Sequence, residues 1–402
     1  MPLGIPIVGA GVISAIGCGM DATFESLFNA KSGIGPISYL STSHDDLPCG
    51  EVHLDNASLK RMAGIPEEEI VPRTALLGIQ ALHEALGSAG LSREDLLGAA
   101  FVSGTTVGGI DITEDRFLQY LSGEGDASLF RLHDCKGTTE ATSRPFGKFA
   151  FSTTISTACS SAANAIIYGA NLIRAGLFDI VVAGGSESLS RYHLNGFNSL
   201  MILDSQPCRP FDESRNGLNL GEGAAYIVLE SPSHAASRGV SPLAYLDGYG
   251  NACDAFHQTA SSPEGDGAFL AMSEALRSAG LSPSDIGYIN AHGTATPNND
   301  ASESAAIRRV FGDSIPPVSS TKGFTGHTTS ASGSIEAVFC ILAMEKSFIP
   351  VNYGWKKGFE GGIVPVNKHI HGVKLDHVLC NAFGFGGNDS SLLLSSSKSR
   401  KP

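Results

Sequence analysis

Short apolar runs alternate with longer segments of helical periodicity along the whole chain. The apolar runs are rich in Val, Ile, Phe and Tyr, which is typical of buried strands. We expect five strands in each half, at IPIVGAGVI, GAAFVSGTT, KFAFSTTIS, DIVVAGG and AAYIVLE, and then at PLAYLDGYGNA, IGYINAHG, PPVSST, DHVLCNAFG and SSLLLS. This alternation predicts an α/β protein with largely buried sheets.

A polar stretch at residues 230–242, ESPSHAASRGVSP, separates two halves that share an order of elements. We therefore expect two units, residues 1–240 and 241–402. In the first unit, FSTTISTACSSAANAIIYGANLIRAG predicts a strand, a short loop holding Cys159, and an amphipathic helix. In the second unit, PVSSTKGFTGHTTSASGSIEAVFCILAME repeats this plan and puts His327 in the loop. A duplicated fold would bring the two loops together across a pseudo-twofold axis.

The composition indicates a well-buried globular protein that is too long for one ordinary core. The chain has 402 residues, of which 42% are hydrophobic and 17% charged. Its net charge of −13 argues against nucleic acid and anionic membranes as partners. No run approaches the ~18 apolar residues that a membrane span needs. The eight cysteines lack paired short spacings, which indicates reduced thiols in a cytoplasmic enzyme, without disulfides or a zinc site.

Cys159 comes just before a predicted helix, and two interpretations are open. Cysteine attacks as the thiolate, and a helix N-terminus is expected to lower the pKa of the thiol by stabilising negative charge. The alternative is a buried structural cysteine, which is the commoner case for one cysteine taken alone.

Two glycine-containing loops carry histidines that favour the catalytic interpretation. NAHGTATPNND places His292 at the end of a predicted strand, followed by Thr294 and Thr296. STKGFTGHTTSASG places Lys322 and His327 in one loop. Either histidine alone would be interpreted as a satisfied core residue. Two such loops, with the cysteine in a matching third, predict an active site.

Two further features have alternative interpretations. NAFGFGGND at residues 381–389 is either a glycine-rich turn or a loop whose Phe385 N–H points at a developing oxyanion beside the N–H of Cys159. Glu336 lies in the largely apolar stretch SGSIEAVFCILAME. A carboxylate buried there would need a cation, and Lys322 is the nearest in sequence. A surface ion pair is the alternative.

Seven motifs occur in one order, GTTVGG, STACSSA, GGSES, RPFDESRNGLNLGEGAA, AHGTATPNND, STKGFTGH and NAFGFGGND. In this order they cover essentially the whole chain, which resembles the elongating β-ketoacyl-[acyl carrier protein] synthases of the thiolase-like superfamily. The resemblance implies a five-layer α-β-α-β-α fold built from two pseudo-duplicated halves. It also implies a dimeric enzyme that needs no metal or redox cofactor.

The resemblance assigns a role to each candidate residue. It implies that Cys159, His292 and His327 are catalytic, with Lys322 supporting them and Glu336 as the ion-pair partner of that lysine. Thr294 and Thr296 match positions that bind the phosphopantetheine arm. Phe385 matches the gating phenylalanine, whose N–H completes the oxyanion hole.

The reaction that the resemblance implies runs in two stages. An acyl group first passes from acyl carrier protein to Cys159 as a thioester. Malonyl-carrier protein then loses carbon dioxide and attacks that thioester, while histidine donors hold the enolate. The expected partners are therefore acyl carrier protein and acyl and malonyl thioesters, in a homodimer or a heterodimer with a chain-length factor.

Three competing interpretations each meet a contrary feature. Gly9 and Gly11 suggest a dinucleotide fingerprint, but Ser14 occupies the third glycine position. A degradative thiolase has a second reactive cysteine in its last glycine-rich loop, whereas Cys380 lies in the preceding predicted strand. A non-catalytic chain-length factor has lost the cysteine that Cys159 supplies here.

Pathway and docking surface stay open at this level. TISTACSSAANAII, ESLSRYHLNGFNSL and INAHGTATPNND look closer to the stand-alone synthases of aryl polyene clusters, although fatty-acid elongation is the common case. Carrier protein is acidic, so docking requires a local basic patch. Lys60, Arg61, Arg73 and Arg209 are candidates, and ordinary solvated positions are the alternative.

Overall fold

The computed structural model describes residues 4–399 and confirms all ten predicted strands. Each half contributes five of them. They are β1 (Ile5–Ser14), β3 (Ala100–Gly104), β4 (Phe151–Ile155), β5 (Ile180–Glu187) and β6 (Gly223–Glu230) in the first half, and β7 (Ala244–Cys253), β8 (Tyr288–Asn290), β9 (Val318–Ser319), β12 (His377–Gly384) and β13 (Asn388–Ser396) in the second. The short strands β2 (Gly17–Cys18), β10 (Phe348–Ile349) and β11 (Ile370–His371) were not predicted.

The two halves of the sheet have the same topology, which agrees with the predicted duplication. The first half runs β4-β3-β5-β6-β1 and the second β9-β8-β12-β13-β7. In both, the first two pairings are parallel and the last two antiparallel. An antiparallel contact between β1 and β7, with Ile5 opposite Leu246, joins the halves.

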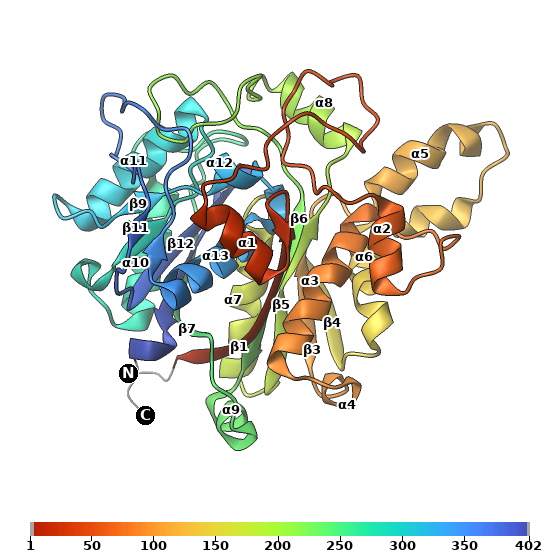
Figure 1. Cartoon of the computed structure of the whole chain (residues 1–402), viewed down its shortest axis with the longest axis horizontal. Coiled ribbons are helices and arrows are strands. Elements are labelled where there is room, and N and C mark those ends of the chain that lie inside the picture. The colour runs from red at the N-terminus through yellow and green to blue at the C-terminus, as the bar shows by residue number, and fades with distance from the viewer. Residues whose placement is uncertain (1–3, 400–402) are drawn as a thin grey trace.

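Helices form three layers around the two half-sheets (Figure 1). Helices α7 (Ser161–Arg174) and α13 (Ser332–Lys346) lie between them and share one large apolar core with the inward side chains of both. Helix α3 (Arg73–Ala89) covers the outer face of the first half, and α10 (Asp266–Ala279) with α11 (Pro297–Phe311) covers the outer face of the second. The order is the five-layer α-β-α-β-α arrangement that the resemblance implied.

The remaining helices lie at the margins of these layers. They are α1 (Met20–Phe28), α2 (Asn56–Ala63), α4 (Arg93–Leu96), α5 (Ile110–Leu121), α6 (Cys135–Ser143), α8 (Arg191–Ser199), α9 (Pro232–Arg238) and α12 (Lys322–Thr325). Helix α9 falls within the polar stretch that separates the halves. No helix within residues 4–399 combines the length and the apolar character needed to cross a membrane.

The glycine pair near the N-terminus serves helix packing. A Cβ at Gly11 would lie 2.2 Å from the carbonyl oxygen of Ala81 in α3. In the second half, a Cβ at Gly250 would lie 2.1 Å from the carbonyl oxygen of Ala271 in α10. Both strands therefore need glycine because a helix backbone crosses directly over them. The contact explains Gly9 and Gly11 without a dinucleotide.

Candidate active site

Cys159 lies in the tight turn between β4 and α7. Ala158 has a φ of 52°, a left-handed conformation that is uncommon for a residue with a side chain. Its carbonyl accepts a hydrogen bond from the N–H of Ser161 at 3.1 Å, which starts the helix. The turn leaves Cys159 only 5% exposed and presents its sulfur to one pocket. The chain thus holds the cysteine at a strained strand-to-helix junction, as at many functional sites.

The expected lowering of the Cys159 pKa is wrong. Burial raises the pKa of this thiol to about 11. Hydrogen bonding from the backbone N–H of Phe385, the ammonium of Lys322 and the N–H of Cys159 act in the opposite direction but do not outweigh burial. The resting group is therefore a neutral thiol, and it must lose its proton when it reacts.

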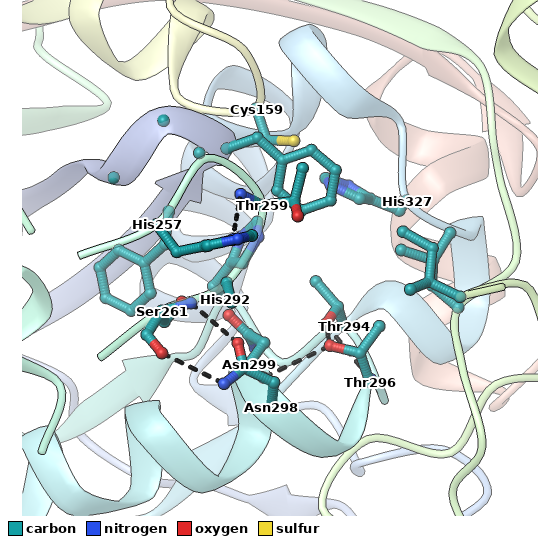
Figure 2. Close-up of a pocket in the computed structure, with 18 of the residues that line it drawn as sticks. Cys159, His257, Thr259, Ser261, His292, Thr294, Thr296, Asn298, Asn299 and His327 are labelled. Carbon is teal, nitrogen blue, oxygen red and sulfur yellow. Dashed lines mark hydrogen bonds between the residues drawn. The ribbon is translucent and has the colours of Figure 1, made fainter. Parts of the chain in front are cut away.

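His292 follows the end of β8, as predicted, and enters the same pocket. Its backbone N–H donates to Glu303 Oε1 at 2.9 Å, and the next N–H, from Gly293, donates to Oε2 at 2.8 Å. The ring of His292 meets the ring of His327 edge to face, with centroids 5.2 Å apart (Figure 2). Within residues 4–399, His292 Nδ1 has no hydrogen-bond partner. Glu303 on α11 thus fixes the backbone turn that carries the histidine.

His327 lies between α12 and α13, and the other half of the chain fixes its backbone. Its N–H donates to the carbonyl of Asn219 at 2.7 Å, and its carbonyl accepts from Gly221 at 2.9 Å. Its Nδ1 lies 3.0 Å from Ser332 Oγ. Burial lowers the pKa of both His292 and His327 well below the usual value, and Lys322 lowers both further. Both rings are therefore neutral imidazoles at neutral pH.

Lys322 and Glu336 form the predicted ion pair, and it is buried. Lys322 Nζ lies 2.5 Å from Glu336 Oε1, and the two side chains are 1% and 4% exposed. The lysine begins α12 and the glutamate lies in the first turns of α13, so the pair clamps the segment that carries His327. The surface alternative is excluded by this burial.

The Phe385 loop joins β12 to β13 and closes one side of the pocket. The ring of Phe385 stacks on Phe197 of α8 at 5.8 Å. Gly386 and Gly387 have φ angles of 83° and 78°, which glycine adopts freely. The Phe385 N–H faces the thiol of Cys159. Two backbone N–H groups, of residues 159 and 385, therefore lie near the sulfur. Their role as an oxyanion hole stays a prediction.

Asn388 links this loop to the nucleophile, and sequence reasoning missed it. Its Oδ1 accepts hydrogen bonds from Ser160 Oγ at 2.7 Å, Asn164 Nδ2 at 2.6 Å and Asn251 Nδ2 at 2.9 Å. These donors come from the cysteine turn, α7 and β7. The pattern NAFGFGGND carried no sign that its first residue after the glycines would contact three distant elements.

The pocket itself encloses about 310 Å³ and contains the cysteine and both histidines. Figure 2 shows Thr294 and Thr296 on one wall, with their hydroxyls 2.9 Å apart. Asn298 and Ser261 exchange two hydrogen bonds of 2.8 and 3.1 Å at the same side. A wall of hydroxyl and amide groups leading to a thiol suits a polar arm with a thioester at its tip.

The docking candidates fare differently. The prediction that Arg73 belongs to a docking patch is wrong, because Arg73 is 9% exposed and its guanidinium pairs with Glu222 at 2.5 Å in the interior. Arg209 is paired with Asp204 at 3.0 Å. Lys60 and Arg61 lie on α2, where Arg61 is exposed and Lys60 donates to a backbone carbonyl at 2.7 Å. Cys380 is buried within β12, so it does not provide a thiolase-type cysteine in the loop.

Comparison with known proteins shows to which family the chain is similar. The chain matches two family models, "Beta-ketoacyl synthase, N-terminal domain" over residues 4–235 and "Beta-ketoacyl synthase, C-terminal domain" over residues 243–356. It is 30% identical to the 3-oxoacyl-[acyl-carrier-protein] synthase 2 of Vibrio cholerae, over 97% of this chain and 98% of that protein.

Two solved structures extend the likeness to the fold. The ishigamide ketosynthase/chain length factor superposes with a TM-score of 0.91 at 31% identity, covering 98% of this chain and 99% of that one. A chain of the complex between the ketosynthase ApeO and its chain length factor ApeC, from Xenorhabdus doucetiae, gives a TM-score of 0.83 at 30% identity, and the match covers 98% of this chain and 98% of that one. With both family models matched across the two halves that build this pocket, the chain belongs to the β-ketoacyl synthase family.

Proposed function

We propose that this chain extends an acyl chain by decarboxylative condensation, with Cys159 as the acylated nucleophile and His292 and His327 as donors to the malonyl thioester. The observation that supports this most is the convergence of one thiol, two neutral imidazoles and two backbone N–H groups in one pocket. A chain-length factor would not need such a set. No step requires a metal or redox cofactor.

In the first stage, Cys159 Sγ attacks the carbonyl of an acyl thioester and loses its proton as the bond forms. The oxyanion that develops accepts hydrogen bonds from the N–H groups of Cys159 and Phe385. The thiolate of the pantetheine arm leaves and takes up a proton, so the acyl group remains on Cys159. Thr294 and Thr296 would bind the arm through their hydroxyls.

In the second stage, malonyl-carrier protein enters and its carboxylate leaves as carbon dioxide. The electron pair of the broken bond moves toward the thioester carbonyl, whose oxygen accepts from His292 and His327. A Ser332 hydroxyl that donates to His327 Nδ1 would leave the hydrogen on Nε2, facing the pocket. The carbanion then attacks the carbonyl carbon of the Cys159 thioester and forms the new C–C bond. The C–S bond breaks, and the released Cys159 thiolate takes up a proton from solvent to restore the free thiol. Lys322 and Glu336 hold the His327 segment in place during this stage.

Intact-protein mass spectrometry tests the assignment. After exposure to acyl-carrier proteins of several chain lengths, peptide mapping should find one acyl adduct, on Cys159. Adding malonyl-carrier protein should then release a 3-oxoacyl product. An adduct on another cysteine, or no product with any donor, would overturn the proposal. The Cys159→Ser variant serves as the matched control, because it keeps the volume and removes the thiolate nucleophile.

The pathway is the finer part of the proposal. The chain is about equally identical, near 30%, to a 3-oxoacyl-[acyl-carrier-protein] synthase 2 and to chains of two structures named for a ketosynthase and a chain length factor. We therefore keep both fatty-acid and polyene acyl groups as candidate substrates. Products from saturated and polyenoic acyl donors, compared in one panel, decide between these substrates. We place the enzyme in the cytoplasm, because acyl carrier protein is its expected partner and all eight cysteines are free thiols.

We also propose that a second ketosynthase-fold subunit covers β4 and α5. Strand β4 is an edge of the sheet, and α5 projects from the body with no buried side chain (Figure 1). Leu118 and Leu121 on this helix are 76% and 64% exposed, which is unusual for large apolar residues on one helix face. Light scattering should show a dimer, and Leu118→Arg should weaken it. A monomer at micromolar concentration would show instead that a different chain, such as a chain-length factor, is required.

A further inference from the structure

Two carboxyl groups lie directly behind the Phe385 loop. Asp389, the second residue of β13, is 4% exposed, and within residues 4–399 its carboxyl group forms no hydrogen bond. Asp254 follows the end of β7 and accepts hydrogen bonds from Ser262 N–H and Oγ, both at 2.6 Å, and from Gly267 N–H at 3.0 Å. A Cβ at Gly267 would lie 2.3 Å from Asp389 Oδ2 and 2.9 Å from the Cβ of Asp254. The two carboxyl groups therefore flank one glycine at the start of α10.

Asp254 is also the residue that holds the loop. Its backbone N–H donates to the carbonyl of Gly387 at 2.8 Å, and the nearby carbonyl of Gln258 accepts from Gly386 at 2.8 Å. These two bonds fix the glycines that follow Phe385. Since the Phe385 N–H faces Cys159, the position of Asp254 bears on the oxyanion hole through a short run of backbone.

The surroundings of Asp389 within residues 4–399 contain negative charge and no balancing cation. Burial, with smaller contributions from Asp254 and Glu303, raises the pKa of Asp389 to about 8. Asp266, the first residue of α10, forms an ion pair with Arg309 at 2.7 Å. Among residues 4–399, neither Asp254 nor Asp389 is paired with a lysine or arginine. The closed arrangement therefore favours a neutral Asp389 beside the hydrogen-bonded carboxylate of Asp254.

We propose that Asp389 is a positioning residue, whose retained proton lets Asp254 hold the Phe385 loop closed over Cys159. The inference rests on the proposed function of that loop. When Asp389 ionises, repulsion between the two carboxylates pushes Asp254 away and weakens its bond to Gly387. The loop then opens more readily.

The sign and range of the pH effect follow from proton linkage. In the closed state Asp389 titrates near pH 8, whereas in a hydrated open state it returns to an ordinary value near ~4. Closure is fully favoured below the lower value and is lost as the pH rises toward the higher one. The opening equilibrium grows by at most about tenfold per pH unit across this range and stops changing above it.

Hydrogen exchange of residues 384–388 tests the proposal on the full chain. Exchange is measured from pH 5.5 to 8.5 in the wild type, in Asp389→Asn and in Asp266→Asn. Dividing the wild-type rate by the Asp389→Asn rate removes the intrinsic pH dependence of exchange. We expect this ratio to rise at least about tenfold between pH 5.5 and 7.5 and then to level off. The exposed control, Asp266→Asn, should follow the wild type.

A ratio that stays constant within about twofold would overturn the proposal. If Asp389→Asn fails to fold, the wild-type rate is divided by the Asp254→Asn rate instead. This ratio should rise over the same range but less steeply, because burial still raises the pKa of Asp389 in that variant. The rate of Cys159 acylation gives a second readout, in which the wild-type to Asp389→Asn ratio should fall with pH. If no variant acylates, the proposed function fails, and the exchange ratio alone then decides the role of Asp389.

Discussion

Replacing Glu336 by Gln tests whether a buried ion pair stabilises the His327 segment. The carboxylate and the Lys322 ammonium are 2.5 Å apart and almost fully buried. Two opposing effects act on the glutamate. Burial raises the pKa of Glu336, and the adjacent ammonium of Lys322 lowers it. The substitution removes the negative charge but keeps the shape, so it measures which effect dominates.

We expect the loss of the partner charge to dominate, because it leaves the Lys322 ammonium buried without compensation. Breaking such a pair typically costs ~3–5 kcal/mol. With an unfolding entropy of ~2.1 cal/mol/K per residue, the 402 residues correspond to ~0.8 kcal/mol/K. The melting temperature should therefore fall by ~4–6 °C. Condensation should slow as well, since Lys322 begins the helix that leads to His327.

Calorimetry at pH 8, together with a condensation assay, checks both expectations. The control is Glu345→Gln, because Glu345 lies in the same helix, pairs with Lys346 and is 41% exposed at its side chain. It should leave melting and turnover unchanged. If Glu336→Gln melts at the wild-type temperature or above it, the burial cost of the carboxylate outweighs its attraction to Lys322, and the reasoning fails.

Three further predictions follow from the site and the packing. His292→Ala and His327→Ala should each lower condensation by ~10²–10³ while Cys159 still acylates; unaltered condensation in both variants would refute their roles. Gly384→Val should slow acylation, because a Cβ there lies 2.9 Å from the carbonyl of Thr157, and full activity would argue against a role of this loop in gating. Gly11→Ala should destabilise the protein by ~1–3 kcal/mol, because the new methyl group would collide with α3. Gly87→Ala, which has open space around it, should stabilise it by ~0.5–1 kcal/mol. Equal melting temperatures of the two variants would refute the packing argument.

The pattern of apolar runs predicted the strands well, because both half-sheets are covered on each face. Strands such as β5 and β6 are buried along their whole length, so they stand out as short continuous apolar runs. Helix α12 has only four residues, too few for a periodicity to appear. Strands β10 and β11 have two residues each and were missed for the same reason.

The sequence predicted those site residues that end strands or precede helices. It did not predict properties that depend on burial or on a partner far along the chain. Cys159 and His327 were found because their loops match. The raised pKa of Cys159 depends on burial that no local pattern reveals. Arg73 was misjudged because its partner Glu222 lies far along the chain. Asn388 and Asp254 were missed because their contacts come from several elements at once.

The duplication explains why the chemistry lies between the halves. Each half ends a parallel pair of strands in a loop that leads to a central helix, and the two central helices pack together. The first half thus supplies Cys159, and the second supplies His327 at the matching place. Asn388, a residue of the second half, accepts hydrogen bonds from Ser160 and Asn164 of the first, so the end of the Phe385 loop is tied to the nucleophile turn. Cys159 faces the two histidines only when the two halves are correctly placed relative to each other. Because the packing of the central helices α7 and α13 sets this placement, it is a condition for catalysis as well as for stability.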